Sequence, residues 1–283
     1  MSIESGVLYV VATPIGNLGD LTPRAELVLK SVDLIAAEDT RHSRPLLQHF
    51  GIHTPLSAYH EHNERQALEK MIGRLEQGES IALISDAGTP LISDPGFPLV
   101  RECQNRGIRV CPVPGACAVV AALSVAGLPT DRFVFEGFPA RTSAARIKQF
   151  EALVAEPRTL VFYESSHRVL ATVSDMAVAF GEQRFAVLTR ELTKTYETLL
   201  SGTLADLKRI IEQDPMQQKG EFVILIAGCA PEEADSLAPE VARTLHILLE
   251  EMPVKRAAAL TAKLTGERKN RLYDQALLWQ KGK

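Results

Sequence analysis

Two aspartates, two glycines and two prolines stand close together in residues 80–96, which read SIALISDAGTPLISDPG. The segment begins as an apolar run typical of a buried strand and then becomes a loop. Asp86 and Asp94 offer oxygen acceptors to hydroxyl or amino groups, and Gly88 lets a ligand approach the main chain closely. Ligands of parallel α/β sheets bind beyond the carboxyl ends of strands, so this loop is a candidate binding site. A rigid connecting loop with Asp caps is the alternative interpretation.

Two further turns have the same character, each placed between an apolar run and a predicted helix. They are residues 13–20 (TPIGNLGD) and 113–118 (VPGACA), in which small residues let a helix N-terminus face a ligand. Neither has the full G-x-G-x-x-G spacing, and the chain contains no Walker A, G-x-S-x-G or H-E-x-x-H pattern. Together the three turns favour a nucleoside-like ligand that needs no phosphate cradle.

The elements that must position these turns indicate an α/β fold of two domains and a helical tail. Strands alternate with helices over residues 1–127, which predicts a parallel, helix-covered sheet. Gly127–Thr130 is the predicted boundary, and residues 128–230 form a second α/β domain. The predicted strands are Val7–Ala12, Leu34–Ala37, Arg109–Val113, Phe133–Gly137, Thr159–Tyr163, Phe185–Thr189, Thr195–Leu200 and Glu221–Ala227.

Residues 231–283 have a different sequence pattern, with three short predicted helices separated by Pro253 and Gly266. From residue 243 onward nine basic side chains outnumber four acidic ones, in a protein whose formal net charge is −4. The tail is therefore either a small helical cap with a solvated face or a nucleic-acid docking element. The overall charge argues against a protein that coats nucleic acid indiscriminately.

Composition indicates a cytoplasmic globular protein without a membrane span. Hydrophobic residues make up 46% of the 283 residues, and the N-terminus has no signal-peptide pattern. The four cysteines form no C-x-x-C pair, so we expect reduced thiols. His53 and the run His60-Glu61-His62 make a metal site conceivable, but a polar loop entering a helix is the favoured interpretation, and no metal is expected.

From about Val7 to Gly228 these motifs resemble the tetrapyrrole methylase superfamily, the class III S-adenosylmethionine-dependent methyltransferases. The runs at 37–41 (AEDTR), 85–96 and 162–168 (FYESSHR) are similar to the branch that acts on ribosomal RNA. The resemblance implies two α/β domains with the cofactor in the cleft between them, and a homodimer. It also implies methyl transfer from S-adenosylmethionine to the ribose 2′-hydroxyl of cytidine 1402 in 16S rRNA of the small ribosomal subunit.

Roles for individual residues follow from the matched motifs. The resemblance places the cofactor against Pro14, Ile15, Asp86, Gly88, Thr89, Ala116, Cys117 and Glu164. Basic side chains that could meet RNA phosphates are Arg41, Arg44, His167 and Arg168. The ribose hydroxyl must lose a proton, and the candidate bases are Glu38, Asp39 and Asp94, at strand ends facing the predicted cleft. Each of these carboxylates could equally be a loop cap or a partner of Arg41.

Two rival functions remain open at this point. A methyltransferase acting on a small tetrapyrrole would have the same fold, because a fold does not fix the substrate. A ribosome-binding protein with a degenerate cofactor site would bind no S-adenosylmethionine. The basic tail and the Glu38–Arg41 run favour RNA.

Overall fold

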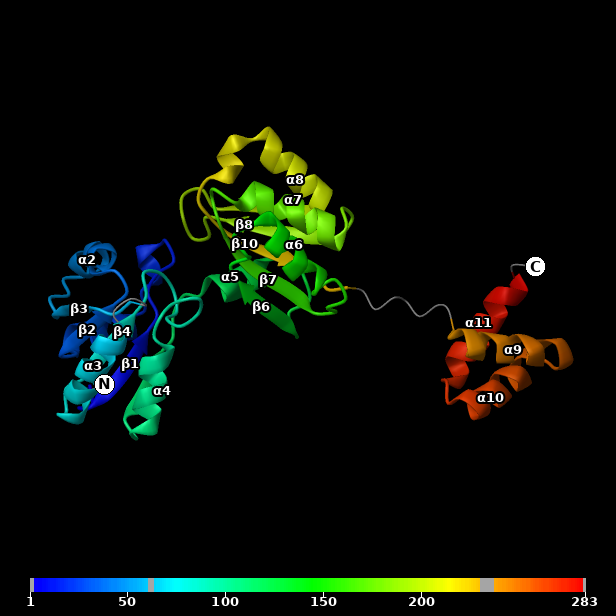
Figure 1. Ribbon diagram of the computed structural model, residues 1–283, viewed down its shortest axis with the longest axis horizontal. Helices are drawn as coiled ribbons and strands as arrows, with labels where there is room; N and C mark the ends of the chain where they lie inside the picture. The colour runs from blue at the N-terminus through cyan, green and yellow to red at the C-terminus, as the bar shows by residue number, and fades with distance from the viewer. Residues whose placement is uncertain (1–2, 61–63, 230–236, 282–283) are drawn as a thin grey trace. The chain divides into compact units, whose positions relative to one another are not determined.

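The computed structural model describes residues 3–60, 64–229 and 237–281. The chain divides into two compact units, Met1–Gly228 and Cys229–Lys283. The larger unit contains two five-stranded sheets, and the smaller one is helical (Figure 1).

The first sheet is wholly parallel, as predicted, with strand order β3-β2-β4-β1-β5. Its strands are β1 (Val7–Val11), β2 (Leu34–Ala37), β3 (Leu56–Ala58), β4 (Ile81–Ile84) and β5 (Arg109–Val113). Side chains alternate between the two faces, so Tyr9 packs with α1 (Pro23–Ser31) on one face and Leu8 packs with α3 (Glu64–Glu76) and α4 (Phe97–Asn105) on the other. Burial of both faces explains why β2 and β4 are continuous apolar runs.

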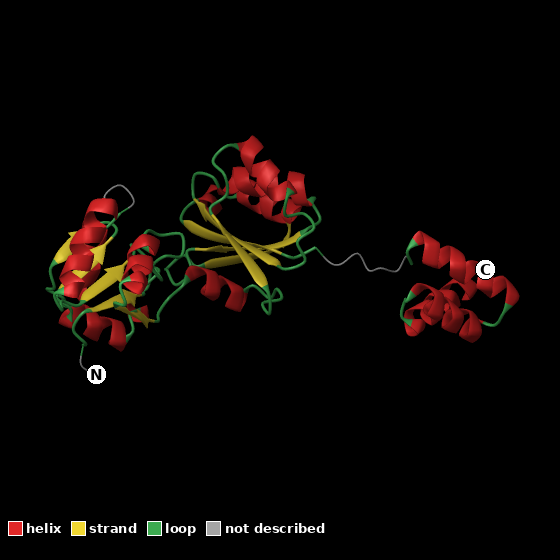
Figure 2. Cartoon of the chain, turned by 60° about the horizontal axis from the view of Figure 1, so that its bottom comes forward, coloured by secondary structure: helices red, strands yellow, loops and turns green. Residues whose placement is uncertain are grey.

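The second sheet has strand order β6-β7-β10-β8-β9 and is mixed. Only β6 and β7 are parallel, and the other neighbours are antiparallel. The strands are β6 (Phe133–Gly137), β7 (Thr159–Ser165), β8 (Phe185–Arg190), β9 (Thr198–Thr203) and β10 (Glu221–Ile226). Three helices, α6 (Ser143–Glu151), α7 (Val169–Phe180) and α8 (Leu204–Gln213), cover one face of this sheet (Figure 2).

Helix α5 (Ala118–Val125) covers the other face of the second sheet, although it follows β5 of the first. Its buried residues Val119, Ala122 and Leu123 pack against Val161 and Val223. Because α5 packs on the second sheet, the chain passes from one sheet to the other between β5 and α5. This passage comes before the predicted boundary at Gly127. The turn at 113–118 is consequently the link between the two sheets.

Local signals placed several helix ends correctly. Thr22 caps α1 by accepting the N–H of Ala25, and Pro23 occupies the first turn. Asp39 caps α2 (Thr40–His49) in the same way through the N–H of Arg41. Among the described strands and α-helices, two had no sequence prediction, the short strand β3 and helix α7.

The smaller unit consists of α9 (Pro239–Glu251), α10 (Val254–Thr265) and α11 (Lys269–Lys281). These helices share a core that includes Leu245, Ala257 and Leu272. Gly266 ends α10 in the left-handed region at φ 75°, a conformation that a side chain disfavours. The rings of His246 and Trp279 stack with centroids 4.0 Å apart. Within the described ranges, no helix combines the length and apolar character that crossing a bilayer requires.

Candidate active site

The three turns singled out in the sequence meet at the carboxyl ends of β1, β4 and β5. Thr13 and Gly88 exchange backbone hydrogen bonds of 2.9 and 3.1 Å, which join the first turn to the second. The Thr89 hydroxyl donates to the carbonyl of Ala116 at 2.9 Å, which joins the second turn to the third. The parallel strands thus bring three separate segments to one place.

Gly88 is required at this junction for two reasons. Its φ of 82° lies where L side chains are strained. A Cβ there would also lie 3.1 Å from Cγ2 of Ile15. The close approach of these two turns therefore depends on a bare backbone.

A cavity of about 410 Å³ opens at this junction, with walls from both sheets. This volume falls within the range of small-molecule sites. Six of the predicted cofactor residues line it, together with one predicted base: Ile15, Asp86, Gly88, Thr89, Cys117, Glu164 and Asp94. Pro14 and Ala116 do not line the cavity, but each is next to a residue that does.

Carboxylates crowd one side of the site. Burial and the nearby Asp94 and Asp86 raise the pKa of Glu38 to about 7. Burial, with a smaller contribution from Asp86, raises the pKa of Asp94 to about 6, against a hydrogen bond from Ser85 that favours the charged form. Asp94 lines the cavity, whereas Glu38, the residue after β2, is not among the lining residues. Such a cluster favours a cationic ligand, which would relieve the repulsion.

Asp39, the third predicted base, has a structural role instead. It caps α2 and holds the guanidinium of Arg41 through both carboxylate oxygens, at 3.2 and 2.8 Å. These hydrogen bonds hold the pKa of Asp39 well below its usual range. A carboxylate stabilised in its charged form is a weak proton acceptor, so the alternative interpretation as a cap and Arg41 partner describes Asp39.

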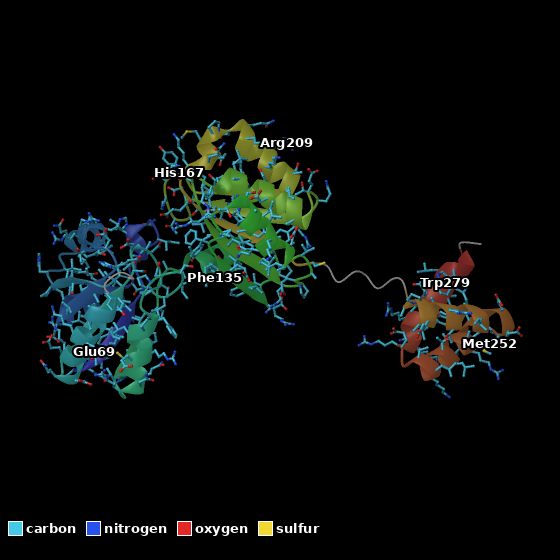
Figure 3. All side chains as sticks on the ribbon, viewed as in Figure 1. Glu69, Phe135, His167, Arg209, Met252 and Trp279 are labelled. Atoms are coloured by element: carbon cyan, nitrogen blue, oxygen red, sulfur yellow. The ribbon has the colours of Figure 1, made fainter. Side chains whose placement is uncertain are left out.

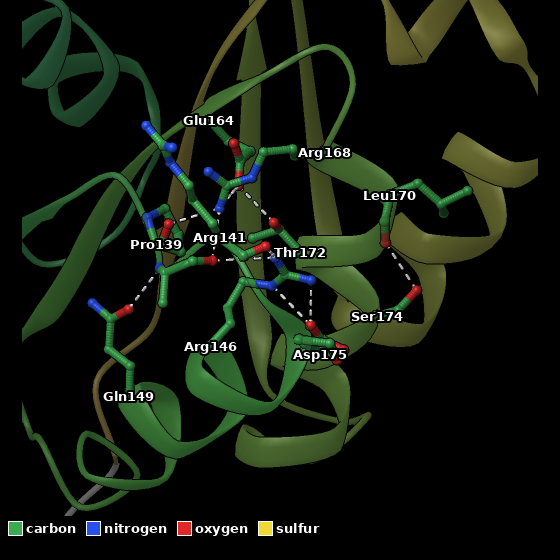
Figure 4. Close-up of polar contacts among 12 residues, drawn as sticks. Pro139, Arg141, Arg146, Gln149, Glu164, Arg168, Leu170, Thr172, Ser174 and Asp175 are labelled. Atoms are coloured by element: carbon green, nitrogen blue, oxygen red, sulfur yellow. Dashed lines mark hydrogen bonds and ion pairs between the residues drawn. The ribbon is translucent and has the colours of Figure 1, made fainter.

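Glu164 lies in the cavity wall, but its carboxylate is committed to other groups of the protein. The side chain is fully buried, and it accepts hydrogen bonds from the Thr172 hydroxyl at 2.6 Å and the Ser165 N–H at 2.8 Å. The guanidinium of Arg168 lies 3.4 Å away (Figure 4). Any contact of Glu164 with a ligand would therefore be made by a carboxylate that is already oriented.

Arg168, predicted as an RNA contact, is half-buried and bonded to backbone carbonyls of its own domain. Its Nη2 donates to the carbonyls of Pro139 and Ala140 at 2.7 and 2.9 Å (Figure 4). The other three basic candidates, Arg41, Arg44 and His167, are exposed (Figure 3 for His167). None of these three lines the cavity, so they are available to a large substrate at the surface.

Several cavity residues carried no sequence prediction, notably Phe138, Tyr163 and Lys194. Lys194 bridges the carboxylates of Glu191 and Glu221, at 2.8 Å each. Its loop reaches the first turn, where the Asn17 N–H donates to the Thr193 hydroxyl at 3.2 Å. The sequence did contain a signal for Lys194, because charged residues follow the predicted strand Phe185–Thr189 and ligands bind where strands end.

Comparison with known proteins identifies the family. Residues 7–208 match the model of Tetrapyrrole (Corrin/Porphyrin) Methylases, and residues 235–280 match the RsmI C-terminal HTH domain. The chain is 59% identical over 276 residues to ribosomal RNA small subunit methyltransferase I of Pseudomonas aeruginosa, covering 97% of this chain and 98% of that protein. The protein of the same name from Escherichia coli O157:H7 is 53% identical, covering 97% and 96%. This chain belongs to the ribosomal RNA small subunit methyltransferase I family.

Solved structures agree with membership of this family at the level of the fold. Uroporphyrin-III-C-methyltransferase from Thermus thermophilus matches with a TM-score of 0.56 at 19% identity, over 78% of this chain and 94% of that chain. A diphthine synthase matches with a TM-score of 0.59 at 14% identity, over 78% and 90%. The predicted fold, with two α/β domains of the tetrapyrrole methylase type and a helical tail, is therefore confirmed for this member of the ribosomal RNA small subunit methyltransferase I family.

A metal site has no support in the parts of the chain that are described. There, no three His, Cys, Asp or Glu side chains come together as a ligand set. The His60-Glu61-His62 run falls partly on residues 61–63, which lie outside the described residues. The four cysteines are free thiols, and Cys117 is one of the cavity-lining residues.

Proposed function

We propose that this protein transfers the methyl group of S-adenosylmethionine to the ribose 2′-hydroxyl of a cytidine in 16S rRNA of the small ribosomal subunit. Position 1402 is the target that the sequence resemblance implies. The observation that carries the proposal is the acidic cavity where the three turns meet. It lies in a chain that matches ribosomal RNA small subunit methyltransferase I over nearly its whole length.

The residues present fit S-adenosylmethionine in size and in charge. Glu38, Asp86 and Asp94 supply negative charge at the cavity. Among the described residues, no ion pair joins these three to a basic side chain. A ligand carrying an ammonium and a sulfonium group would complement this side of the site. Ile15, Gly88 and Cys117 offer apolar or bare-backbone surface to a nucleoside.

When bound, this cofactor supplies a methyl group activated by positively charged sulfur. The protein must then hold the accepting oxygen in line with that methyl group, and alignment of this kind supplies several kcal/mol. The mutual hydrogen bonds of Thr13 and Gly88, and the one from Thr89 to Ala116, fix the turns that would hold the nucleoside. This alignment of the reacting groups is separate from the proton transfer.

The accepting hydroxyl must lose its proton, and Asp94 is the candidate base that lines the cavity. A pKa raised to about 6 gives it more proton affinity than an ordinary carboxylate while leaving it largely charged at pH 7. Glu38, whose pKa is raised to about 7 by burial and by the nearby Asp94, is suited to receive or share the proton. We therefore place the base within the Glu38–Asp94 pair.

The smaller unit is proposed to dock on ribosomal RNA. It matches a domain described as HTH, and it carries the excess of basic residues noted in the sequence. Electrostatic attraction of this kind gives affinity without requiring base contacts. We also propose a homodimer, as the resemblance implies, which a molar mass from light scattering would test.

Methylation of a small tetrapyrrole is the second candidate function. The fold-level match to a uroporphyrin-III-C-methyltransferase raises this candidate, but at 19% identity that match bears on the fold alone. The relatives at 53–59% identity are named for ribosomal RNA. A ribosome-binding protein without catalysis would need a site unable to hold the cofactor.

The deciding experiment is transfer of a labelled methyl group to purified small ribosomal subunits, followed by mapping of the modified nucleotide. We expect label on the ribose of one cytidine. Label appearing instead on a porphyrinogen would support the second candidate. Calorimetry with S-adenosylmethionine separates both enzymes from the non-catalytic alternative, which would show no binding.

A further inference from the structure

One aromatic side chain at the cavity, Phe138, has no role in the function proposed above. Phe138 lines the cavity, yet 55% of it is exposed. Other wall residues, such as Glu164, Thr189 and Phe222, are buried. Phe138 is therefore one of the cavity residues that reach solvent, together with Ile92, Ser93 and Glu221. A substrate must enter the cavity from solvent.

The Phe138 ring has a defined orientation. It packs edge-to-face on Tyr163, with centroids 5.5 Å apart and an interplanar angle of 60°. Tyr163 in turn packs edge-to-face on Phe135 of β6, at 4.9 Å. An edge-to-face contact covers at most one face of a ring, so the exposure of Phe138 leaves ring surface open for stacking.

The loop after Phe138 is fixed by hydrogen bonds to three side chains. Arg168 donates to the carbonyls of Pro139 and Ala140, as described above. Nη1 of Arg146 donates to the carbonyls of Ala140 and Arg141, both at 3.3 Å (Figure 4). The Ala140 N–H donates to Oε1 of Gln149 at 3.1 Å.

Arg146 is itself held in place. It is 4% exposed, and its Nε donates to Asp175 of α7 at 2.7 Å. The loop carbonyls are thus anchored to α6 and α7 through two guanidinium groups. A loop that is already fixed loses little conformational entropy when the substrate binds, as expected of a preorganised site.

We propose that Phe138 is the stacking platform for the nucleobase of the target cytidine. This inference rests on the proposed function and deepens it by naming a residue that positions the RNA substrate. A ribose hydroxyl inside a folded RNA reaches a cavity of this kind when its nucleotide leaves the base stack. An exposed aromatic face of the cavity replaces the stacking that the flipped base has lost.

The test compares Phe138→Ala, Phe138→Trp and a control, Phe185→Ala. Phe185 is 43% exposed at the start of β8 and does not line the cavity. The kcat/KM for small subunits should fall by about 5- to 150-fold in F138A, the loss expected for one base–aromatic stack. F138W should keep most of the activity, F185A should match wild type, and the calorimetric affinity for S-adenosylmethionine should stay within about twofold in all three.

Two outcomes of this activity comparison would overturn the inference. One is an F138A enzyme as active as wild type, and the other is an equal loss of cofactor affinity and activity, which would place Phe138 against the cofactor instead. A second readout is quenching of a fluorescent cytidine analogue, placed at the target position of an RNA oligonucleotide, by wild type but not by F138A. Wild-type protein that quenches but transfers no methyl group would refute the proposed function and leave this inference standing. Absence of Phe138-dependent quenching would refute the inference itself.

Discussion

The backbone N–H of Asp39 donates a hydrogen bond of 3.0 Å to Oδ1 of Asp86. This bond joins the loop after β2 to the loop after β4, on the acidic side of the cavity. Asp86 therefore lines the cavity and also ties two strand ends together.

Replacement of Asp86 tests the placement of the cofactor. We expect Asp86→Ala to weaken S-adenosylmethionine binding by about 10-fold or more, because hydrogen bonds to charged groups contribute about 1.5–3 kcal/mol. Asp86→Asn keeps an acceptor for the Asp39 N–H and should lose less. Isothermal calorimetry gives both affinities, with the exposed Asp131→Ala as the control. Unchanged affinity in D86A would contradict our placement of the cofactor.

Cofactor affinity should depend on pH through the acidic cluster. The pKa of Asp94 is raised to about 6 and that of Glu38 to about 7, so both carboxylates become fully charged only above neutral pH. A cationic ligand binds the charged forms better, and its affinity should therefore rise between about pH 5.5 and 7.5. Calorimetry across this range measures the trend. A flat profile would indicate that these carboxylates do not face the positive charge of the ligand.

The same shift predicts how Glu38→Gln changes stability. The pKa of Glu38 is about 7 in the folded protein and 4.5 in its ordinary state, so the folded protein binds the proton more tightly. The contribution of Glu38 to the free energy of unfolding therefore decreases as pH rises from about 4.5 to 7 and is constant above.

In E38Q this dependence is removed. The variant should match wild type near pH 4.5 and become the more stable protein by pH 8. Thermal unfolding of both proteins at each pH makes the comparison, with a gain of about 2–4 °C for each kcal/mol. Parallel curves at all pH values would argue against a buried, repelled Glu38.

The buried carboxylate of Glu164 predicts a large cost for Thr172→Val. The Thr172 hydroxyl is fully buried and donates to Glu164 at 2.6 Å, so the substitution leaves a buried charge with one donor fewer. We expect a loss of about 1.5–3 kcal/mol in the free energy of unfolding, measured with urea. Ser174→Ala on the same helix is the matched control, because its hydroxyl donates to the Leu170 carbonyl within α7 and its loss should have little effect (Figure 4). Equal losses in the two variants would mean that the remaining donors to Glu164, the Ser165 N–H and Arg168, are sufficient without Thr172.

Removal of the smaller unit should separate cofactor binding from docking. Residues 1–228 form a compact unit with both sheets and the whole cavity, so a chain ending at Gly228 should fold and bind S-adenosylmethionine as the full protein does. Methyl transfer to small subunits should fall strongly, and the salt dependence of binding should become shallower as basic contacts are lost. Full activity of the shortened chain would exclude a docking role for residues 229–283.

Local patterns in the sequence determined much of this protein. Short apolar runs bounded by turn residues predict strands, so β2, β5 and β6 have the predicted bounds. The Thr22–Pro23 pair and Gly266 mark helix ends because their backbone preferences act over a few residues. The meeting of the three turns could also be inferred, since parallel strands bring their carboxyl ends to one edge.

The tertiary structure decided what depends on partners distant in the chain. From the sequence alone, Asp39 and Asp94 are equivalent candidate bases. Only the folded chain pairs Asp39 with Arg41 and places Asp94 in the cavity wall. Strand direction in the second sheet, the passage of α5 onto that sheet and the position of Phe138 in the cavity wall likewise depend on long-range packing. Charge state and exposure are properties of a whole environment, and that environment exists only after the distant segments have packed together.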